Sequence, residues 1–331
     1  MSEGFTWSPD ISQTYTKRDG TQTIKLPPSS SFDKEDNTNF TMEAQDEILT
    51  LQNDSDETPI YWPVFHGNMA DDGKIFNLNI STGTLKVDYT SENRDHTVAY
   101  LGCAENASLN LKDSGILKIT NPGTVFMFID YITLDKNKYP KLTMSGNSQF
   151  EIKQIKKILS DSPAFIFLAS DISLHGSSQF TLESSDLYLG DGNFNYCNIN
   201  ICDDSVVNLS NNGIMLRSGI DEVKTKFNLR AGSPKLNISS FTGINFPIDL
   251  VYVKYPEGLF NFITTEGKNK GKLIIDIPDP RLTDTDFWDE IFKQKLIAVD
   301  HKIGIKEYFN YSYGAVTRQG QQVSTIIISL K

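Results

Sequence analysis

The sequence predicts an all-β fold, a parallel and right-handed β-helix, on the strength of three observations. From about residue 75 onward, short segments alternate apolar and polar side chains, as strands with one buried face do. Clusters of small and turn-forming residues separate these segments. Comparable segments return at intervals of roughly 25 to 40 residues, which is typical of a solenoid with inserted loops.

The stretch SSQFTLESSDLYLG, which starts at Ser177, illustrates the repeated unit. Its FTL and LYL segments each bury only one or two side chains, too few to offset the entropy lost on ordering them. Stacked coils bury a continuous apolar column and pair their backbones with the coils above and below. Small residues such as Ser177 and Ser178 suit the corners of each coil. The comparable positions in successive coils are Leu109, Leu142, Ile172, Ile199 and Leu236.

The alternative fold is an antiparallel β-sandwich, in which turns also recur about every ten residues. Tight hairpins favour Asn-Gly or Asp-Gly loops. The chain has one of each, at Asn212-Gly213 and Asp191-Gly192, but most segments are joined by Ser-Ser, Asp-Ser or Ser-Gly-Asn-Ser. We therefore place the β-helix first and keep the sandwich as the alternative.

Changes in composition divide the chain into three regions. A polar and irregular N-terminal cap with an aromatic cluster precedes the repeats, and a cap of a helix and a strand follows them. The predicted boundaries are 1–70 for the first cap, 71–280 for the β-helix repeats and 281–331 for the C-terminal cap. A terminal cap is expected, because an open β-helix end exposes unpaired strand edges.

The predicted C-terminal helix rests on apolar spacing. We expect it to start at Thr283 or Asp284 and to end before Gly304. The segment STIIISLK then closes the chain as a strand. The apolar residues with roughly helical spacing are Phe287, Ile291, Leu296 and Val299.

Composition limits the classes of partner. The net charge of −11 disfavours nucleic acid and anionic membranes. The longest apolar runs, such as AFIFLA, are too short to span a bilayer, so no membrane insertion is expected. Three cysteines, Cys103, Cys197 and Cys202, form neither a disulfide framework nor a zinc motif. No metal site and no cofactor is predicted.

The segments MSGNSQFEI, HGSSQFTLESSDLYL and DDSVVNLSNNGIMLRS resemble the passenger repeats of bacterial autotransporter adhesins of the pertactin and AIDA type. The resemblance covers roughly residues 75–280. It implies a β-helix stalk at the bacterial surface or released from it, with a role in adhesion. The sequence has neither a signal peptide nor the family's C-terminal translocator barrel, which leaves the export route open.

The apparent solenoid, the acidic surface and the lack of a convincing catalytic set favour a non-catalytic binding protein, expected outside the cell or on the bacterial surface. Its expected partner is a host cell-surface glycan or protein, bound along a lateral face or at inserted loops. Aromatic rings stack on sugars and anchor interfaces. The candidate contacts are Tyr188, Phe194, Tyr196, Tyr61 and Trp62.

Two alternatives stay open. The first is a polysaccharide lyase or hydrolase with acids near 175–204, since such enzymes also use β-helices and need two carboxylates facing one cleft. The second is a toxin or effector carrier, in which residues 281–331 act and the repeats only carry them. The catalytic candidates of the first alternative are His175, Asp203, Asp204 and Arg217. The two aspartates are equally well explained as turn formers.

Overall fold

The computed structural model confirms the all-β prediction, because nearly all its regular elements are strands. It divides into two compact units, Met1–Asp171 and Ile172–Lys331, which are described separately. Within the described residues, no helix is long and apolar enough to cross a membrane. The described residues are 4–8, 10–25, 37–53, 61–64, 77–89, 98–101, 107–121, 124–127, 141–154, 165–168, 171–189, 197–215, 225–250, 255–278 and 284–331.

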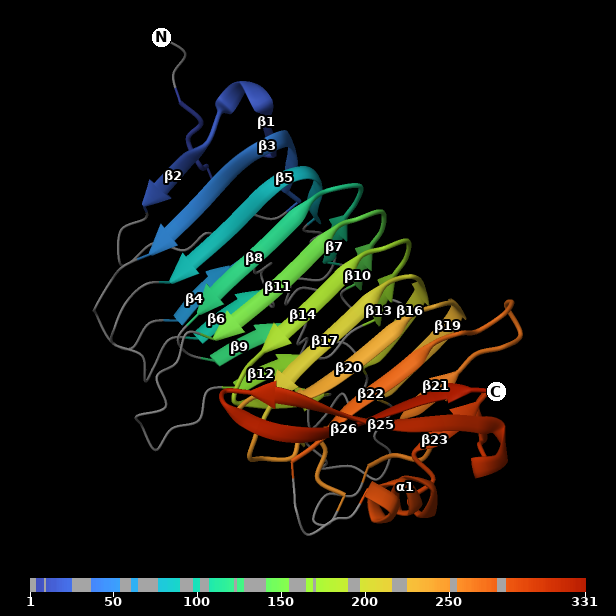
Figure 1. Cartoon of the computed structure of the whole chain (residues 1–331). Coiled ribbons are helices and arrows are strands. Elements are labelled where there is room, and N and C mark those ends of the chain that lie inside the picture. The colour runs from blue at the N-terminus through green and yellow to red at the C-terminus, as the bar shows by residue number, and fades with distance from the viewer. Residues whose placement is uncertain are drawn as a thin grey trace. The chain divides into compact units, whose positions relative to one another are not determined.

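The strands of the first unit form three parallel stacks. One contains β1, β7, β10 and the first halves of β3 and β5, and the next contains β2, β8, β11 and the second halves of β3 and β5. The third contains β4, β6, β9 and β12. Figure 1 shows β3, β5, β8 and β11 side by side, each from a different coil.

The elements of this unit, with a short 3₁₀ helix η1, are β1 (Gln13–Thr16), η1 (Lys17–Asp19), β2 (Gln22–Lys25), β3 (Asn39–Asn53), β4 (Tyr61–Val64), β5 (Asn77–Tyr89), β6 (Val98–Leu101), β7 (Ser108–Leu111), β8 (Ile116–Asn121), β9 (Thr124–Met127), β10 (Lys141–Met144), β11 (Gln149–Gln154) and β12 (Phe165–Leu168). Parallel pairing therefore begins at Gln13, inside the segment expected to be an irregular cap.

The second unit repeats this arrangement. β16, β19, β21 and β23 form one parallel stack, β14, β17, β20 and β22 form another, and β15 pairs with β18. Its strands begin with β13 (Asp171–Leu174), β14 (Gln179–Glu183), β15 (Asp186–Leu189), β16 (Asn198–Asp203), β17 (Val206–Asn211) and β18 (Ile214–Met215). They continue with β19 (Lys226–Gly232), β20 (Lys235–Ser240), β21 (Phe260–Phe262), β22 (Lys272–Ile277) and β23 (Ile297–Val299).

The parallel pairing excludes the sandwich alternative and confirms the β-helix. In-register stacking places like residues above one another, as with Phe227 and Phe260 or Leu236 and Leu273. All four side chains are buried, and the two phenylalanine rings stack with centroids 5.8 Å apart. Each coil thus adds a layer to one apolar column.

A shared corner explains how such short strands can follow one another. In five coils, a residue two or three places after the last buried apolar residue of the segment has a positive φ, a conformation that favours glycine and tolerates aspartate. Serines two places further on, Ser148, Ser178 and Ser205, are fully buried. The corner residues are Asp113 (49°) and Gly146 (68°) in the first unit, and Gly176 (67°), Asp203 (56°) and Gly232 (104°) in the second.

The C-terminal cap contains the predicted helix and the predicted final strand, but the predicted length of the helix is wrong. α1 (Asp284–Lys293) begins at one of the two predicted residues and ends well before Gly304. Leu296 lies beyond the helix and Val299 lies in β23. The chain leaves the helix there because β23 pairs in parallel with β21, which satisfies its backbone groups and extends the stack.

Antiparallel strands complete the second unit. β24 (Lys302–Ile303) pairs with β23, and the 3₁₀ helix η3 (Lys306–Tyr308) leads into the hairpin of β25 (Phe309–Arg318) and β26 (Gln321–Leu330). β26 pairs with β22, so the hairpin covers the edge of the last parallel strand of its stack. The cap therefore ends the parallel pairing.

Candidate functional site

The catalytic candidates of the sequence lie at coil corners. Asp203 is the corner residue at the end of β16, and one of its carboxylate oxygens accepts a hydrogen bond from the backbone N–H of Gly176, 2.9 Å away. Gly176 is the equivalent corner of the preceding coil of the second unit. The backbone of Asp203 thus forms one corner, and its carboxylate binds the corner of the preceding coil.

The other catalytic candidates are only partly brought to Asp203. His175 Nδ1 lies 4.0 Å from Asp203 Oδ2, and both side chains are exposed. The backbone N–H of Asp204 donates to the carbonyl of Gly176 over 2.9 Å, and its side chain is exposed. Arg217 lies outside the described residues. The contacts described for Asp203 and Asp204 are those of turn-forming residues.

The aromatic candidates lie on the strands β15 and β4 or outside the described residues. Tyr188 is half-buried in β15 and pairs with Met215 of β18. Tyr61 and Trp62 belong to β4 and pair with Val98 and Ala99 of β6, but their side chains are outside the described set. Phe194 and Tyr196 also fall outside it.

Sequence reasoning missed a row of asparagines on the outer face of β16, β19 and β21. Asn200, Asn228 and Asn261 are the in-register partners in these three strands. Residues on either side of each asparagine point inward and are buried, such as Ile199 and Ile201. Because side chains alternate along a strand, the three amides line up on the opposite face. We call them the amide row.

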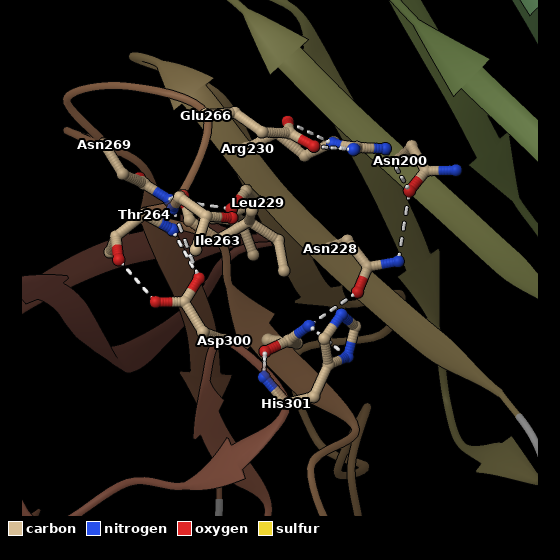
Figure 2. Close-up of polar contacts among 12 residues, drawn as sticks. Asn200, Asn228, Leu229, Arg230, Ile263, Thr264, Glu266, Asn269, Asp300 and His301 are labelled. Carbon is tan, nitrogen blue, oxygen red and sulfur yellow. Dashed lines mark hydrogen bonds and ion pairs between the residues drawn. The ribbon is translucent and has the colours of Figure 1, made fainter.

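Hydrogen bonds run along the amide row, as Figure 2 shows. Asn228 Nδ2 donates to the Oδ1 atoms of Asn198 and Asn200, at 2.7 and 3.1 Å. Asn261 Nδ2 donates to Asn228 Oδ1 over 2.9 Å and contacts His301 Nδ1 at 3.1 Å. The backbone N–H of His301 donates to Asn261 Oδ1 over 3.0 Å. Asn228 and Asn261 are buried, whereas Asn200 is half-buried.

An arginine and a glutamate border the exposed end of the amide row. Arg230 Nη1 donates to Asn200 Oδ1 over 3.2 Å, and its Nε donates to Glu266 Oε2 over 2.7 Å. A second bond from Nη2 to Glu266 Oε1 makes the pair bidentate. Hydrogen bonding from Arg230 lowers the pKa of Glu266. The pair fixes the guanidinium plane, so Arg230 is pre-organised rather than free to rotate.

A turn anchored by Asp300 completes the border. Asp300 Oδ1 accepts the backbone N–H of Thr264 at 2.8 Å, and Oδ2 accepts the Thr264 hydroxyl. Hydrogen bonding from Thr264 lowers the pKa of Asp300. Asn269 Nδ2 donates to the carbonyls of Leu229 and Ile263, at 2.7 and 3.0 Å, and holds the other side of this loop. Figure 2 shows these residues grouped beside the amide row.

The arrangement offers fixed hydrogen-bond donors and acceptors on an outer face, with charges of both signs. Within the described part of the chain, no group of three or more His, Cys, Asp or Glu side chains is placed to hold a metal ion. Cys197 and Cys202 are free thiols, and Cys103 lies outside the described residues. The asparagine in each of INI, FNL and FNF was the sequence signal for the row.

Comparison with known proteins adds no relative. No family model, no curated protein and no solved structure matches this chain.

Proposed function

We propose that this chain is a non-catalytic binding protein that recognises an uncharged or weakly charged glycan through the exposed end of the amide row. The observation that carries the proposal is the fixed set of polar groups formed by Asn200, Arg230 and Glu266 on one outer face. Sugar hydroxyls both donate and accept hydrogen bonds, and this set contains donors and acceptors whose positions are set before binding.

The Asn200 end of the amide row is the part open to a ligand, because Asn228 and Asn261 are buried. Among the described contacts, Asn200 uses its Oδ1 as an acceptor twice, while no hydrogen bond is formed by its Nδ2. In Figure 2 that nitrogen points away from the row. It is therefore the first donor a ligand would meet.

The proposal also covers the location of the protein and the role of its C-terminal region. A host cell-surface glycan requires a protein outside the cell or on the bacterial surface, and the resemblance to autotransporter passengers supports that location. The close fit of the C-terminal region into the fold supports a cap rather than a toxin segment, since β23 and β26 extend sheets of the second unit.

A glycan array with the purified chain, followed by titration of any retained glycan, tests the proposal. We expect Asn200→Leu and Arg230→Met each to weaken binding at least tenfold, about 1.4 kcal/mol. The matched control is Asn208→Leu on β17, because Asn208 is also half-buried and also bonds the amide of the next coil, Asn237, at 2.7 Å. Equal losses in all three variants, or no retained glycan, contradict the proposal.

A separate experiment tests the enzyme alternative. Incubation with acidic polysaccharides and an assay for new reducing ends or unsaturated products measures turnover. Asp203→Gly keeps a residue suited to the positive φ of this corner and removes the carboxylate. Turnover by the native chain that is lost in a folded Asp203→Gly variant replaces the binding proposal with a lyase or hydrolase.

A further inference from the structure

Strand β25 lies at the edge of its sheet. All ten of its residues pair with β26, and β26 pairs with β22 on its other side. Among the described residues, no strand pairs with the second edge of β25. In Figure 1 this hairpin lies beyond β22, near α1. An edge of this length is a template for pairing with another strand.

The hairpin geometry determines which backbone groups point outward. Gln319 and Gly320 both have positive φ, at 43° and 84°, which makes a two-residue type I′ turn between Arg318 and Gln321. At the other end, the N–H of Lys331 donates to the carbonyl of Tyr308 over 3.0 Å. Even-numbered residues of β25 therefore bond to β26. The N–H and C=O groups of the odd-numbered residues point to the open edge.

The edge lacks the usual protection against pairing. Edge strands are commonly guarded by charged side chains, proline or a bulge. Residues 309–317 contain no charged residue and no proline, and the pairing of β25 with β26 has no register shift. The one charge of the strand, Arg318, is bonded to Asp276. In a chain of net charge −11, an uncharged edge lets two copies approach with little local charge repulsion.

We infer that two copies of this chain pair antiparallel through β25, with a two-fold axis at Tyr313. Outward-facing residues must pair with each other, and an axis at Tyr313 meets this condition by setting Tyr313 opposite Tyr313 of the second copy. The same register sets Tyr311 opposite Ala315 and Phe309 opposite Thr317. Each large side chain beside the axis then faces a small one, which makes the strand complementary to itself.

The odd-numbered face of β25 is already held in shape for this pairing. Tyr311 stacks on Trp288 of α1, with centroids 4.3 Å apart, and Tyr313 meets Tyr311 edge-on at 5.6 Å. Tyr311 is nonetheless 48% exposed, so the stacked pair has a free side. The added strand lies in the plane of the sheet and leaves these contacts intact.

Sedimentation analysis of the full chain over a range of concentrations tests the inference. A single strand pair is a small interface, so we expect a dimer that dissociates at roughly micromolar concentration. Tyr313→Lys and Tyr313→Glu each place like charges opposite one another and should each be monomeric. An equimolar mixture of the two should restore the dimer, because a lysine then faces a glutamate.

Ser312→Lys is the matched control. It adds the same charge one residue away, on the other side-chain face and opposite Gly314 of the second copy, so the dimer should persist. A monomeric native chain overturns the inference, and so does a dimer that Tyr313→Lys leaves unchanged. A mixture of the Lys and Glu variants that stays monomeric also overturns it.

Cross-linking measures the register directly. In a hydrogen-bonded antiparallel pair the opposed Cα atoms lie about 5.5 Å apart, within the range of a disulfide. Tyr313→Cys should therefore cross-link under mild oxidation, while Thr317→Cys, opposite Phe309, and the native chain should not. Cross-linking of Thr317→Cys in place of Tyr313→Cys contradicts the proposed axis.

Discussion

Arg318 Nε donates to Oδ2 of Asp276 over 2.8 Å, which joins β25 to β22 across the intervening strand β26. The carboxylate is 1% exposed and the arginine side chain 37% exposed. The same oxygen of Asp276 accepts the buried backbone N–H of Ser240 over 3.0 Å. One buried carboxylate thus ties the hairpin to two strands of the parallel stack.

Removing the two partners of this pair should have unequal effects. Arg318→Met leaves a buried carboxylate without its cation and should lower the free energy of unfolding by about 3 kcal/mol. Asp276→Asn keeps an acceptor for Ser240, and the exposed arginine can turn to water, so it should cost only about 1 kcal/mol. Urea unfolding measures both. A larger loss in Asp276→Asn than in Arg318→Met would contradict this account.

The corner glycine of the last regular coil should be hard to replace. A Cβ at Gly232 would lie 2.5 Å from the Cα and carbonyl oxygen of Asp203, and its φ is +104°. Gly232→Ala should therefore cost at least about 2 kcal/mol. Gly320→Ala is the control: its φ is also positive but no heavy atom lies within 4 Å, so about 1 kcal/mol is expected. Equal costs by thermal or urea unfolding would show that the corner contact is unimportant.

The stacked core should respond strongly to loss of one layer. Phe260 is fully buried between coils and stacks on Phe227. Phe260→Ala should lower the free energy of unfolding by about 3 to 5 kcal/mol, because it leaves a cavity in the column. Tyr308→Ala, at a side chain that is 53% exposed, should change it by no more than about 0.5 kcal/mol. A small effect at Phe260 would mean that the column can collapse around the gap.

The turn at Asp300 predicts a small acid-dependent change in stability. Hydrogen bonding from Thr264 holds the pKa of Asp300 below its ordinary value of 3.8. Because the folded-state pKa is lowered, the ionised carboxylate stabilises the fold above pH 3.8. This stabilisation is lost as the pH falls through the folded-state pKa. Native chain and Asp300→Asn should therefore differ in unfolding free energy at pH 6 and converge near pH 2. The difference should stay below about 1 kcal/mol, since this carboxylate is near the surface. A difference that grows in acid would contradict the sign.

The repeat of alternating segments was sufficient to predict the fold, because burial in a stacked column demands that pattern locally. Asn212-Gly213, the strongest hairpin signal, is instead a bend between β17 and β18, and the Thr242 hydroxyl donates to Asn212 Oδ1 over 3.1 Å. The spacing of Leu296 and Val299 was compatible with a helix, but pairing of β23 with β21 decided otherwise. Local spacing cannot foresee a partner that lies 37 residues earlier in the chain, as Phe260 does for Ile297.

The amide row was not predicted because asparagine is ordinarily a turn residue in sequence analysis. Its meaning depends on register: three asparagines become one row only when the coils stack with no offset. Asp203 is the opposite case, in which the sequence suggested chemistry and the structure shows a role in the backbone. Its place in the same segment as His175, residues 175–204, suggested an acid catalyst. Its positive φ and its hydrogen bond with Gly176 are those of a corner residue.

The described hydrogen bonds between asparagine side chains of successive coils all run in one direction along the chain. In each described asparagine pair between coils, the later residue donates from Nδ2 to Oδ1 of the earlier one, as Asn77 does to Asn39, Asn110 to Asn79, Asn237 to Asn208 and Asn261 to Asn228. The final acceptor, on Asn261, is taken by the backbone of His301. An engineered extra coil would thus fit before β21 with an asparagine at its middle position. After β21 the parallel stack continues into β23, where Ala298 stands opposite Asn261, so the series of amide hydrogen bonds ends at β21 although the stack does not.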